Sequence, residues 1–459
     1  MSGRSGREYG RVVPDTDLTA AAVKTYLYGY PLVYNLVEIQ RLLDGTSPVA
    51  PGCRPNRFTP ARELLGPEAT FVSPNNDTCY LMAGCDLRRG PLLLSVPDTH
   101  DRYYVLQFVD AWSENFAYIG RRATGTSAQT FVLAPAGYDG DIPDGATLVE
   151  VPTSVFAIVG RVQVDGVDDL PAVHAVQDQF SLGPLDGTSG RDGFGVPRVT
   201  VDVSDDLRWW EEFRVALAAF PPSSADAEFL ETAAQLGLTG TSSPLVDPDP
   251  DLAAALIEGC TRGEATLEEL TKTALKMVDG WTGAMHAFDY NLDHLGIGTI
   301  DAPEWKIADR TTAYVTRAVA ARLGLWGNHG YEARYDVLWQ DEHGDELDGS
   351  HAYELTLDPP PKVDAFWSLT MYDEPDYYLV ANEIDRYSIG DRTPGLEVGP
   401  NGSVTILMQH ARPADEHLAN WLPAPTGKFR PILRSYQPTG PMLTGEYVLP
   451  KVRKLTGPR

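Results

Sequence analysis

A β-rich stretch at residues 101–112 reads DRYYVLQFVDAW. A second stretch far along the chain, at residues 364–375, reads DAFWSLTMYDEP. When the two are aligned, an acid opens each stretch, an aromatic pair follows, and a leucine and a second acid fall in register. Such a recurrence predicts a repeated structural unit. The matched pairs are Asp101/Asp364, Tyr103/Phe366, Tyr104/Trp367, Leu106/Leu369 and Asp110/Asp373.

A second pair of stretches repeats in the same order and with a similar separation. Residues 151–161 read VPTSVFAIVGR, and residues 424–434 read APTGKFRPILR. We therefore predict two copies of one antiparallel β unit, of the sandwich or jelly-roll type. Residues shared by both copies most simply serve the fold, whereas residues found in one copy only are better candidates for a site. The shared residues here are Pro152/Pro425, Thr153/Thr426, Phe156/Phe429 and Arg161/Arg434.

β-rich and helical sequence patterns alternate along the rest of the chain. Short β-rich runs separated by Gly, Pro and Asp fill residues 69–170 and return after residue 331. Helical patterns fill residues 17–44 and 205–326. We predict a multidomain α+β fold, with two β-sandwich units of similar topology and helical segments before and between them. The predicted divisions are an N-terminal helical segment (1–68), the first β unit (69–204), a helical domain (205–328) and the second β unit (329–459).

Capping residues predict where the helices begin and end. Asp17 is placed to cap the first helix, and Pro31 should break or kink that helix. Thr266 with Glu269 forms a capping-box pattern, which predicts that a helix begins there. Gly324 is placed to end the last helix of the central region.

The charge balance excludes several classes of partner. The chain carries 37 basic and 64 acidic residues, a net charge of −27. An acidic surface repels a phosphate backbone and anionic lipid, so we expect no nucleic acid and no membrane as partner. No run reaches about 18 uninterrupted apolar residues. Residues 1–15 lack the apolar region of a signal peptide, so we expect a cytoplasmic protein.

Sequence signatures of cofactor sites are missing. The four cysteines are too few for a disulfide scaffold and do not have zinc-site spacing. The chain also lacks a GxGxxG stretch after a strand, a Walker motif and a GxSxG elbow. We therefore expect no cofactor and no metal.

A polar cluster without a counterpart in the second copy lies in SPNNDTCY, residues 73–80. Asn75, Asn76 and Asp77 are residues that favour tight turns, because their side chains bond to nearby backbone. Alternatively they line a site, in which Asp77 accepts a hydrogen bond from a substrate hydroxyl or a water and Tyr80 supplies a donor. Both interpretations stay open.

Two further stretches are candidates. NEIDRYSIGDR, residues 382–392, concentrates Arg386, Tyr387 and Asp391. An arginine among acids usually ties loops together, but its planar fork also suits a carboxylate or a phosphate. In the later stretch ANWLPAP, Trp421 follows Asn420 and either plugs a sandwich edge or forms the apolar wall of a pocket.

Long motifs in the chain resemble two domain families. SPNNDTCYLMAGCDLRRGPLLLSVPDTHDRYYVLQFVDAW and VPTSVFAIVGR resemble the DUF1254 domain. DAFWSLTMYDEPDYYLVANEIDRYSIGDR and NWLPAPTGKFRPILRSYQP resemble the DUF1214 domain. The resemblance implies two β-sandwich units with helical segments between them, and it implies no activity, because both names denote domains of unknown function. Recurrent positions of the families match at Asn75, Asn76, Asp77, Arg102, Tyr103, Arg386, Tyr387, Asn420, Trp421 and Pro423.

These observations lead to a functional hypothesis. We expect a protein that binds or transforms a small organic molecule in a cleft near the junction of the two β units. If it is an enzyme, cofactor-independent hydrolysis or lyase chemistry is the least demanding, with Asp77 as general base and Arg386 stabilising negative charge. The alternative is a non-catalytic carbohydrate-binding, lipid-binding or assembly module, and a homo-oligomer stays open. The expected ligand-binding residues are Asn75, Asn76, Tyr80, Arg102, Tyr387, Asp391, Asn420 and Trp421.

Overall fold

The structure is a computed structural model that describes residues 17–457 except 71, 189–194, 274, 275 and 284. These residues form helices and several β-sheets, so the predicted multidomain α+β class is confirmed. They divide into two compact units. The first unit comprises the described residues up to Gly29 together with Arg198–Thr266, and the second comprises Tyr30–Pro197 together with the described residues from Leu267 onward.

Helices build the first unit. Two of them, α1 and α5, approach closely: a Cβ on Gly259 would lie 2.3 Å from the Cβ of Ala22, and one on Gly263 would lie 2.4 Å from the Tyr26 ring. The Trp209 ring centroid lies 4.6 Å from that of Tyr26, so aromatic side chains fill the space beside this contact. The helices that contribute are the first part of α1 (Leu18–Asp44), α3 (Arg208–Ala219), α4 (Ala227–Gln235) and most of α5 (Pro250–Thr273).

Two of the predicted helices have the expected caps. Asp17 accepts a hydrogen bond from the N–H of Ala20 at 3.0 Å and caps α1. Pro31 was predicted to break or kink this helix, and the break is wrong, since α1 continues through Pro31 to Asp44. A proline removes one hydrogen bond from the helix, and here this loss does not end it. Helix α6 (Arg310–Gly324) ends at Gly324, as predicted.

The predicted helix start at Thr266 is wrong. Helix α5 begins at Pro250, where Asp249 accepts two backbone N–H groups of the first turn. Thr266 lies inside this helix, and its hydroxyl donates to the carbonyl of Arg262. A proline at the first helical position behind an aspartate cap is a strong start signal, and it lies sixteen positions earlier in the chain. The helix ends at Thr273, before the short strands that the capping-box pattern did not predict.

The first part of the second unit contains two sheets. The five-stranded sheet has the order β1-β2-β8-β4-β5 with antiparallel neighbours. The first four-stranded sheet has the order β7-β6-β3-β9, in which β6 and β7 are parallel. Helix α2 (Leu170–Gln177) precedes the last strand. The strands are β1 (Thr59–Pro60), β2 (Thr78–Asp86), β3 (Leu92–Val96), β4 (Tyr104–Val109), β5 (Asn115–Gly120), β6 (Gln129–Pro135), β7 (Thr147–Val151), β8 (Val155–Gln163) and β9 (Ser181–Pro184).

The second part of this unit also contains two sheets. The six-stranded sheet has the order β10-β11-β12-β18-β14-β15, and the second four-stranded sheet has the order β17-β16-β13-β19. In the latter, β16 and β17 are parallel. The short helix α7 (Pro441–Thr444) follows β18. The strands are β10 (Met277–Val278), β11 (Trp281–Gly283), β12 (Ala333–Leu338), β13 (Tyr353–Leu357), β14 (Trp367–Asp373), β15 (Ser388–Gly390), β16 (Val404–Gln409), β17 (Trp421–Pro423), β18 (Phe429–Tyr436) and β19 (Arg453–Lys454).

Strand order and register are the same in the two parts. Adding ten to each strand label turns β2-β8-β4-β5 into β12-β18-β14-β15, and β7-β6-β3-β9 into β17-β16-β13-β19. Tyr80 lies opposite Arg161 in the first part, and Tyr335 lies opposite Arg434 in the second. These arginines are the ones that the sequence alignment paired.

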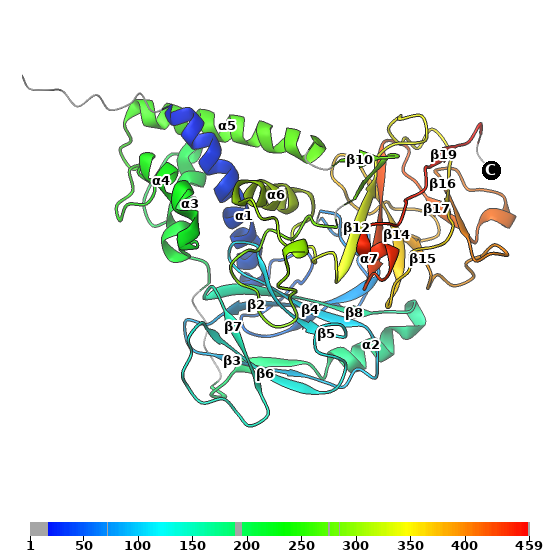
Figure 1. Ribbon diagram of the computed structural model, residues 1–459, viewed down its shortest axis with the longest axis horizontal. Coiled ribbons are helices and arrows are strands. Elements are labelled where there is room, and N and C mark those ends of the chain that lie inside the picture. Colours follow the sequence, from blue (N-terminus) through cyan, green and yellow to red (C-terminus); the bar gives the residue numbers. More distant parts are fainter. Residues whose placement is uncertain (1–16, 71, 189–194, 274–275, 284, 458–459) are drawn as a thin grey trace, which may run out of the picture. The chain divides into compact units, whose positions relative to one another are not determined.

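Burial explains why the strands differ in sequence. Every residue of β2, β4 and β5 is buried, so both faces of the five-stranded sheet are covered and its strands consist largely of continuous apolar runs. Strands β3 and β13 alternate between buried and half-buried positions, which is typical of a sheet with one face on a core. One core cluster joins both sheets of the first part, and another joins both sheets of the second. Figure 1 shows β2, β4 and β8 above β3 and β6.

The five-stranded and six-stranded sheets also pack against each other. A third cluster of buried side chains contains Tyr103 and Tyr118 from the first part and Phe366 and Tyr436 from the second. The ring centroid of Tyr103 lies 5.5 Å from that of Phe366 and 5.8 Å from that of Tyr436. These contacts bring the two sheets face to face.

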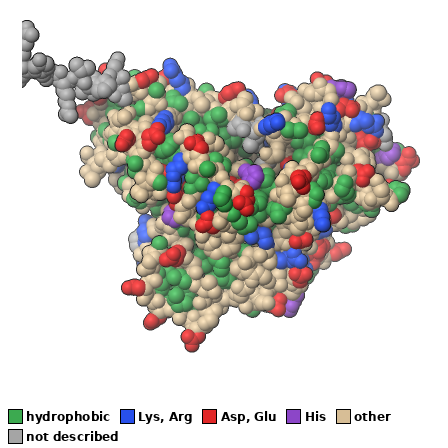
Figure 2. Space-filling model, in the orientation of Figure 1, with side chains coloured by type: hydrophobic (Ala, Val, Ile, Leu, Met, Phe, Trp, Pro, Cys, Tyr) green, Lys and Arg blue, Asp and Glu red, His purple; other side chains and the backbone are tan. Residues whose placement is uncertain are grey.

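Within the described part of the chain, no helix has the length and apolar character needed to cross a membrane. The chain carries a net charge of −27. On the face drawn in Figure 2, acidic side chains are scattered among basic and apolar ones and do not gather into one patch.

Candidate functional site

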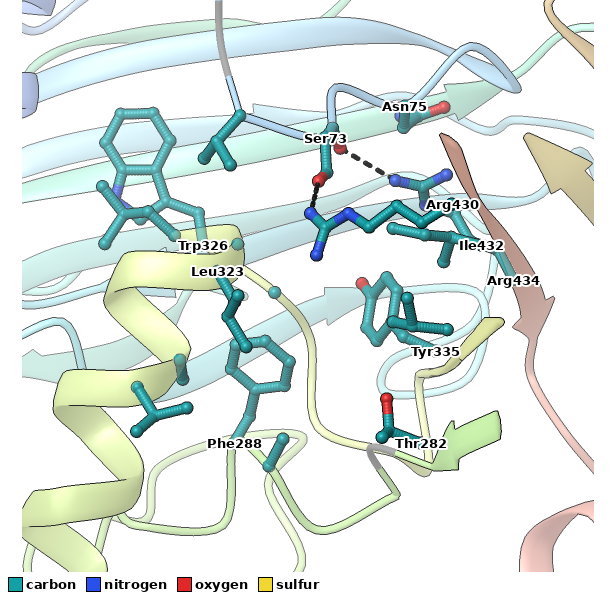
Figure 3. A pocket seen from close by; sticks show the side chains of 18 of the residues that line it. Ser73, Asn75, Thr282, Phe288, Leu323, Trp326, Tyr335, Arg430, Ile432 and Arg434 are labelled. Carbon is teal, nitrogen blue, oxygen red and sulfur yellow. Dashed lines mark hydrogen bonds between the residues drawn. The ribbon is translucent and has the colours of Figure 1, made fainter. Parts of the chain in front are cut away.

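A cavity of about 140 Å³ lies between the five-stranded and the six-stranded sheet (Figure 3). Strands β2 and β8 contribute to its lining from the first part, and β11, β12 and β18 contribute from the second. Helix α6, the segment after it, the loop at residues 72–75, Thr271 of α5 and residues 287 and 288 also contribute. All of these residues belong to the second unit.

Two equivalent tyrosine–arginine pairs enter the cavity. Tyr80 and Arg161 are cross-strand neighbours on β2 and β8, and Tyr335 and Arg434 are cross-strand neighbours on β12 and β18. Directly opposed residues share a face of a sheet, and all four side chains line the cavity. The guanidinium carbon of Arg161 lies 5.7 Å from the centroid of the Tyr80 ring.

Both arginines are buried and bonded to uncharged groups. Arg161 is 6 % exposed and Arg434 is 3 % exposed. Each donates two hydrogen bonds to protein acceptors, at distances of 2.8 to 3.0 Å. The acceptors are Gln107 Oε1 and the Trp326 carbonyl for Arg161, and Thr370 Oγ1 and the Ser73 carbonyl for Arg434.

A third arginine, Arg430 of β18, also lines the cavity and is only 1 % exposed. Its guanidinium carbon lies 3.3 Å from the ring centroid of Tyr377 and 5.1 Å from that of Trp339. Its Nη2 donates to Ser73 Oγ at 2.7 Å, while its Nε has no hydrogen-bond partner among the described residues. Figure 3 shows this guanidinium in the space between Ser73 and Tyr335.

Among the residues that the structure describes, the three guanidinium groups have no acidic partner at short range. Within the described ranges, no Asp or Glu oxygen lies within 4.0 Å of Arg161, Arg430 or Arg434. Glu374 acts on Arg430, and Asp77 acts on Arg434, from a greater distance. Burial lowers the pKa of Arg430 to about 10, which leaves it cationic at neutral pH. Because a buried charge without a partner is costly, the cavity is electrostatically suited to an anion.

Phenol groups add further hydrogen-bond donors. The Tyr335 hydroxyl accepts hydrogen bonds from the backbone N–H and the side-chain amide of Asn328, each at 3.1 Å. The Tyr80 hydroxyl accepts from the N–H of Asn75 at 3.4 Å. In the part of the chain that the structure describes, neither phenol proton has a protein acceptor. Both protons are therefore available to a bound molecule.

The rest of the lining is mostly apolar. It includes Val319, Ala320 and Leu323 of α6, together with Phe288 and Ile432. Figure 3 shows Phe288 and Leu323 on the side of the cavity away from the loop that carries Ser73. The cavity thus combines a region of charged and phenolic donors with a region of apolar side chains.

The predicted residues of the stretch 73–80 divide between two cavities. Asn75 and Tyr80 line the cavity between the sheets, whereas Asn76 and Asp77 line a second one of about 130 Å³. Asn75 Oδ1 accepts from the N–H groups of Asp77 and Thr78, and its amide nitrogen donates to the Thr78 hydroxyl. The polar atoms of Asn75 are therefore used in a local turn before β2.

The other two residues of this stretch bond to the six-stranded sheet. Asp77 accepts hydrogen bonds from Ser368 Oγ at 2.7 Å and from the Tyr436 hydroxyl at 3.3 Å. Asn76 accepts from Ser388 Oγ at 3.2 Å. Burial, and then the charge of Asp77, raises the pKa of Tyr436. The stretch thus joins the two parts of the second unit through polar contacts.

Arg386 and Tyr387 lie outside both of these cavities. The Arg386 guanidinium donates to the carbonyls of residues 418, 419 and 421 at 2.7 to 3.1 Å, and burial lowers its pKa. The Tyr387 hydroxyl donates to Asp385 at 3.1 Å. The structure does not bring Arg386 and Asp77 to one cavity.

Four other predicted residues also lie outside the cavity between the sheets: Arg102, Asp391, Asn420 and Trp421. Arg102 forms an ion pair with Asp169 at 2.5 Å. The side chains of Asn420 and Trp421 bond to backbone groups of neighbouring loops and strands. Asp391 accepts a backbone N–H and lines a separate cavity.

In the described part of the chain, metal-ligating side chains do not cluster, and the Cys79 and Cys85 thiols are buried. Among the described residues, no three His, Cys, Asp or Glu side chains are grouped closely enough to hold a metal ion. Burial raises the pKa of the Cys79 thiol to about 11 and also raises that of Cys85. Both thiols are therefore protonated at neutral pH, whereas the thiolate is the reactive form.

The sequence analysis missed Arg161, Arg430 and Arg434 as site residues. Arg161 and Arg434 were assigned to the fold because both copies share them. A signal was present, since an arginine inside an otherwise apolar strand needs a reason to be buried. In the same alignment Arg430 falls opposite Ala157, so it is present in the second copy only and met the criterion for a site candidate.

Comparisons with protein families match two segments of the chain. Residues 55–184 match the family described as a protein of unknown function, DUF1254. Residues 332–440 match the family described as a protein of unknown function, DUF1214. Together the segments cover about half of the chain, and they contain most strands of the two parts of the second unit.

Solved structures that are similar to this chain include the following two. The crystal structure of the VPA0106 protein from Vibrio parahaemolyticus is 26% identical, with a TM-score of 0.66 over 96% of this chain and 100% of that chain. An uncharacterized protein from Burkholderia cenocepacia is 11% identical, with a TM-score of 0.45 over 96% of each chain. No curated protein matches the chain significantly. The first similarity covers nearly the whole chain and supports the arrangement described above.

Proposed function

We propose the function of this chain from its own cavity. The chain belongs to the family of proteins that carry a DUF1254 and a DUF1214 domain, and neither family name assigns an activity. We propose that the protein binds a small organic molecule between the five-stranded and the six-stranded sheet. The observation that carries the proposal is a cavity of about 140 Å³ that combines buried guanidinium groups with an apolar helix face. Small-molecule sites typically combine apolar walls with a few convergent polar groups.

Binding is a better proposal than catalysis because two buried groups of the lining, Arg430 and Tyr436, titrate far from neutral pH. Burial lowers the pKa of Arg430 only to about 10, and it raises that of Tyr436. A general acid or base works best when its pKa is near the operating pH. A cofactor-independent hydrolase or lyase with Asp77 as general base is the second candidate, because Asp77 lines the cavity of about 130 Å³, whereas Arg386 lies outside that cavity. A carbohydrate or lipid carrier would use the cavity between the sheets without chemistry.

We also propose that the two parts of the second unit are jelly-roll-like β-sandwiches that arose by duplication. The equal strand orders, the equal Tyr–Arg register and the parallel pairs β6/β7 and β16/β17 at corresponding places support this proposal. In each part the chain crosses repeatedly between two sheets that share one core. Under this proposal, the two sandwiches correspond to the β units predicted at residues 69–204 and 329–459.

Native mass spectrometry of the purified full-length chain with metabolite pools tests the binding proposal. We expect bound small molecules with the wild type and their loss in Leu323→Trp, which places a bulky ring in the cavity. Thr311→Trp is the matched control, because Thr311 is exposed on the same helix and does not line the cavity. Equal retention by both variants, or the absence of any bound molecule from the wild type, would contradict the proposal.

The catalytic candidate has its own test. Ester, lactone and glycoside reporter substrates are incubated with the wild type and with Asp77→Asn. Turnover by the wild type that is lost in the variant would favour chemistry at Asp77. Turnover that is unchanged in the variant would remove Asp77 as the general base.

A further inference from the structure

We propose that the molecule bound in this cavity is an organic acid, whose carboxylate is held by Arg430 and whose apolar body lies against α6. This inference rests on the proposed binding function and names the ligand class. It depends on the charges in the cavity, on the unused hydrogen-bond donors and on the position of the apolar wall.

The charge balance of the cavity favours an anion. Three guanidinium groups are buried in its wall, and in the described part of the chain none has a carboxylate within ion-pair distance. Among the described residues, Asp77 is the one acid whose carboxylate bonds to a lining side chain, and the partners of that carboxylate are the hydroxyls of Ser368 and Tyr436. A carboxylate in the cavity would supply the charge partner that the protein itself does not place there.

Unused donors point to Arg430 as the residue that binds the head group. A guanidinium carries five N–H bonds. Arg161 and Arg434 each use two of them on protein acceptors, whereas Arg430 uses one, on Ser73. The Nε of Arg430 is buried and has no partner among the described residues. A planar carboxylate accepts two parallel bonds from such a fork, so it matches the donors that remain.

Two phenols can complete the head-group site. The Tyr335 hydroxyl already accepts two hydrogen bonds from Asn328, so donating its own proton is the interaction still available to it. Figure 3 shows that this hydroxyl points toward the guanidinium groups. Tyr80 offers a second proton from the opposite sheet. The oxygens of a carboxylate can accept hydrogen bonds from these donors, whereas a neutral apolar group would leave the donors unpaired.

Arg430 makes the two parts of the second unit contribute different charges to the cavity. The Tyr–Arg pairs occur in both parts of the second unit, but the counterpart of Arg430 is Ala157. The second part therefore supplies the additional charge. Val319, Ala320 and Leu323 of α6 supply the apolar side, against which a hydrocarbon chain or a ring would bury its surface.

Calorimetric titration of the full-length protein with octanoate and with octanamide tests the inference. The two probes share a tail and differ in the charge of the head. We expect octanoate to bind at least about tenfold more tightly, the change that a hydrogen bond to a charged group typically produces. If octanamide binds as tightly as octanoate, the acid assignment is wrong and the proposed binding function stands. If neither probe binds, and native mass spectrometry also finds no bound molecule, the binding function itself is wrong.

Variants assign the head group to Arg430. Arg430→Met should remove the preference for octanoate while octanamide binding stays within about threefold, and Arg412→Met on the exposed surface should change neither. Because the wild-type comparison needs no variant, the test does not depend on folding of Arg430→Met. The thermal midpoint of Arg430→Met without ligand should equal or exceed that of the wild type, since the substitution removes a buried charge that lacks an acidic partner. Retention of the octanoate preference by Arg430→Met would overturn the role of Arg430.

Discussion

At the scale of single residues, the most informative side chains are charged or titratable ones in places where apolar side chains are expected. Arg161 lies among buried apolar residues in β8, and Arg434 lies in β18, which is buried throughout and also contains Arg430. Replacing a buried charge by a well-packed apolar group is often neutral or stabilising. Their presence at equivalent positions therefore favours a role beyond folding, namely to present donors to the cavity.

His329 is a second buried titratable residue, and its surroundings keep it neutral. The Tyr118 hydroxyl accepts the backbone N–H of His329, and it lies 3.0 Å from His329 Nδ1. The proton of this hydroxyl is thus available to Nδ1, which must be unprotonated to accept it. Burial lowers the pKa of His329 to about 3, and the charge of Arg122 adds to this effect.

The buried histidine predicts a dependence of stability on pH. Its pKa in the folded state lies below the ordinary value near 6.5, so between these two values the unfolded state binds more protons. The stabilising contribution is complete above about pH 6.5 and is lost as the pH falls toward 3, with a loss of about 2 kcal/mol by pH 5. Urea unfolding at pH 7, 6 and 5 should show this slope in the wild type and a smaller slope in His329→Gln. His100→Gln, at an exposed position, should keep the wild-type slope, and equal slopes in all three proteins would contradict the assignment.

At the scale of elements, strand β8 shows how closely the neighbouring strands of the five-stranded sheet pack against one another. A Cβ on Gly160 would lie 2.4 Å from the Leu81 carbonyl oxygen and 2.9 Å from Leu106 Cδ2. Backbone on one side and a buried leucine on the other leave no room for a side chain. The glycine is therefore required by close packing.

Substitution of this glycine should weaken the sheet. Gly160→Ala should lower the free energy of unfolding by roughly 1–3 kcal/mol, the usual cost of overpacking a core. Gly183→Ala is the matched control, because Gly183 also lies in a strand and a Cβ there would meet no atom within 4 Å. The control should stay within about 0.5 kcal/mol of the wild type. Equal losses in both variants, measured by urea unfolding, would mean that the close contact is not the cause.

The helices show the limit of local patterns. In the capping-box pattern at Thr266, two side chains could cap the first turn of a helix. The same residue types also fit the interior of a helix. In α5 the threonine hydroxyl bonds to the carbonyl one turn earlier. Only the start at Asp249 and Pro250, sixteen positions upstream, decides between the two roles.

At the scale of the whole molecule, the second unit contains two separate cores joined by a third contact. Leu94 belongs to the core of the first part and Leu355 to that of the second, and each is completely buried in the middle of a corresponding strand. The cores share no residue. Substitutions in them should therefore act independently.

This independence can be measured by a double-mutant cycle. Leu94→Ala and Leu355→Ala should each lower the free energy of unfolding by about 2–5 kcal/mol, because each leaves a cavity in a packed core. The double variant should lose the sum of the two to within about 0.5 kcal/mol. A coupling energy well above this limit would show that the two cores do not respond separately, and a loss below 1 kcal/mol in either single variant would contradict the packing described here.

The amino-acid sequence alone determined the two families, the α+β class, the order of β-rich and helical regions, and the correspondence of Arg161 with Arg434. These features are local or repeat along the chain, so composition, periodicity and alignment reveal them. Only the tertiary structure decided which polar side chains share a cavity. Tyr80, Arg161, Tyr335 and Arg430 lie on strands far apart in sequence, and strand register together with the packing of the five-stranded sheet on the six-stranded sheet brings them together. The stretch at residues 73–80 shows the same dependence, because β2 turns Tyr80 toward the cavity while the turn before it uses the amide of Asn75.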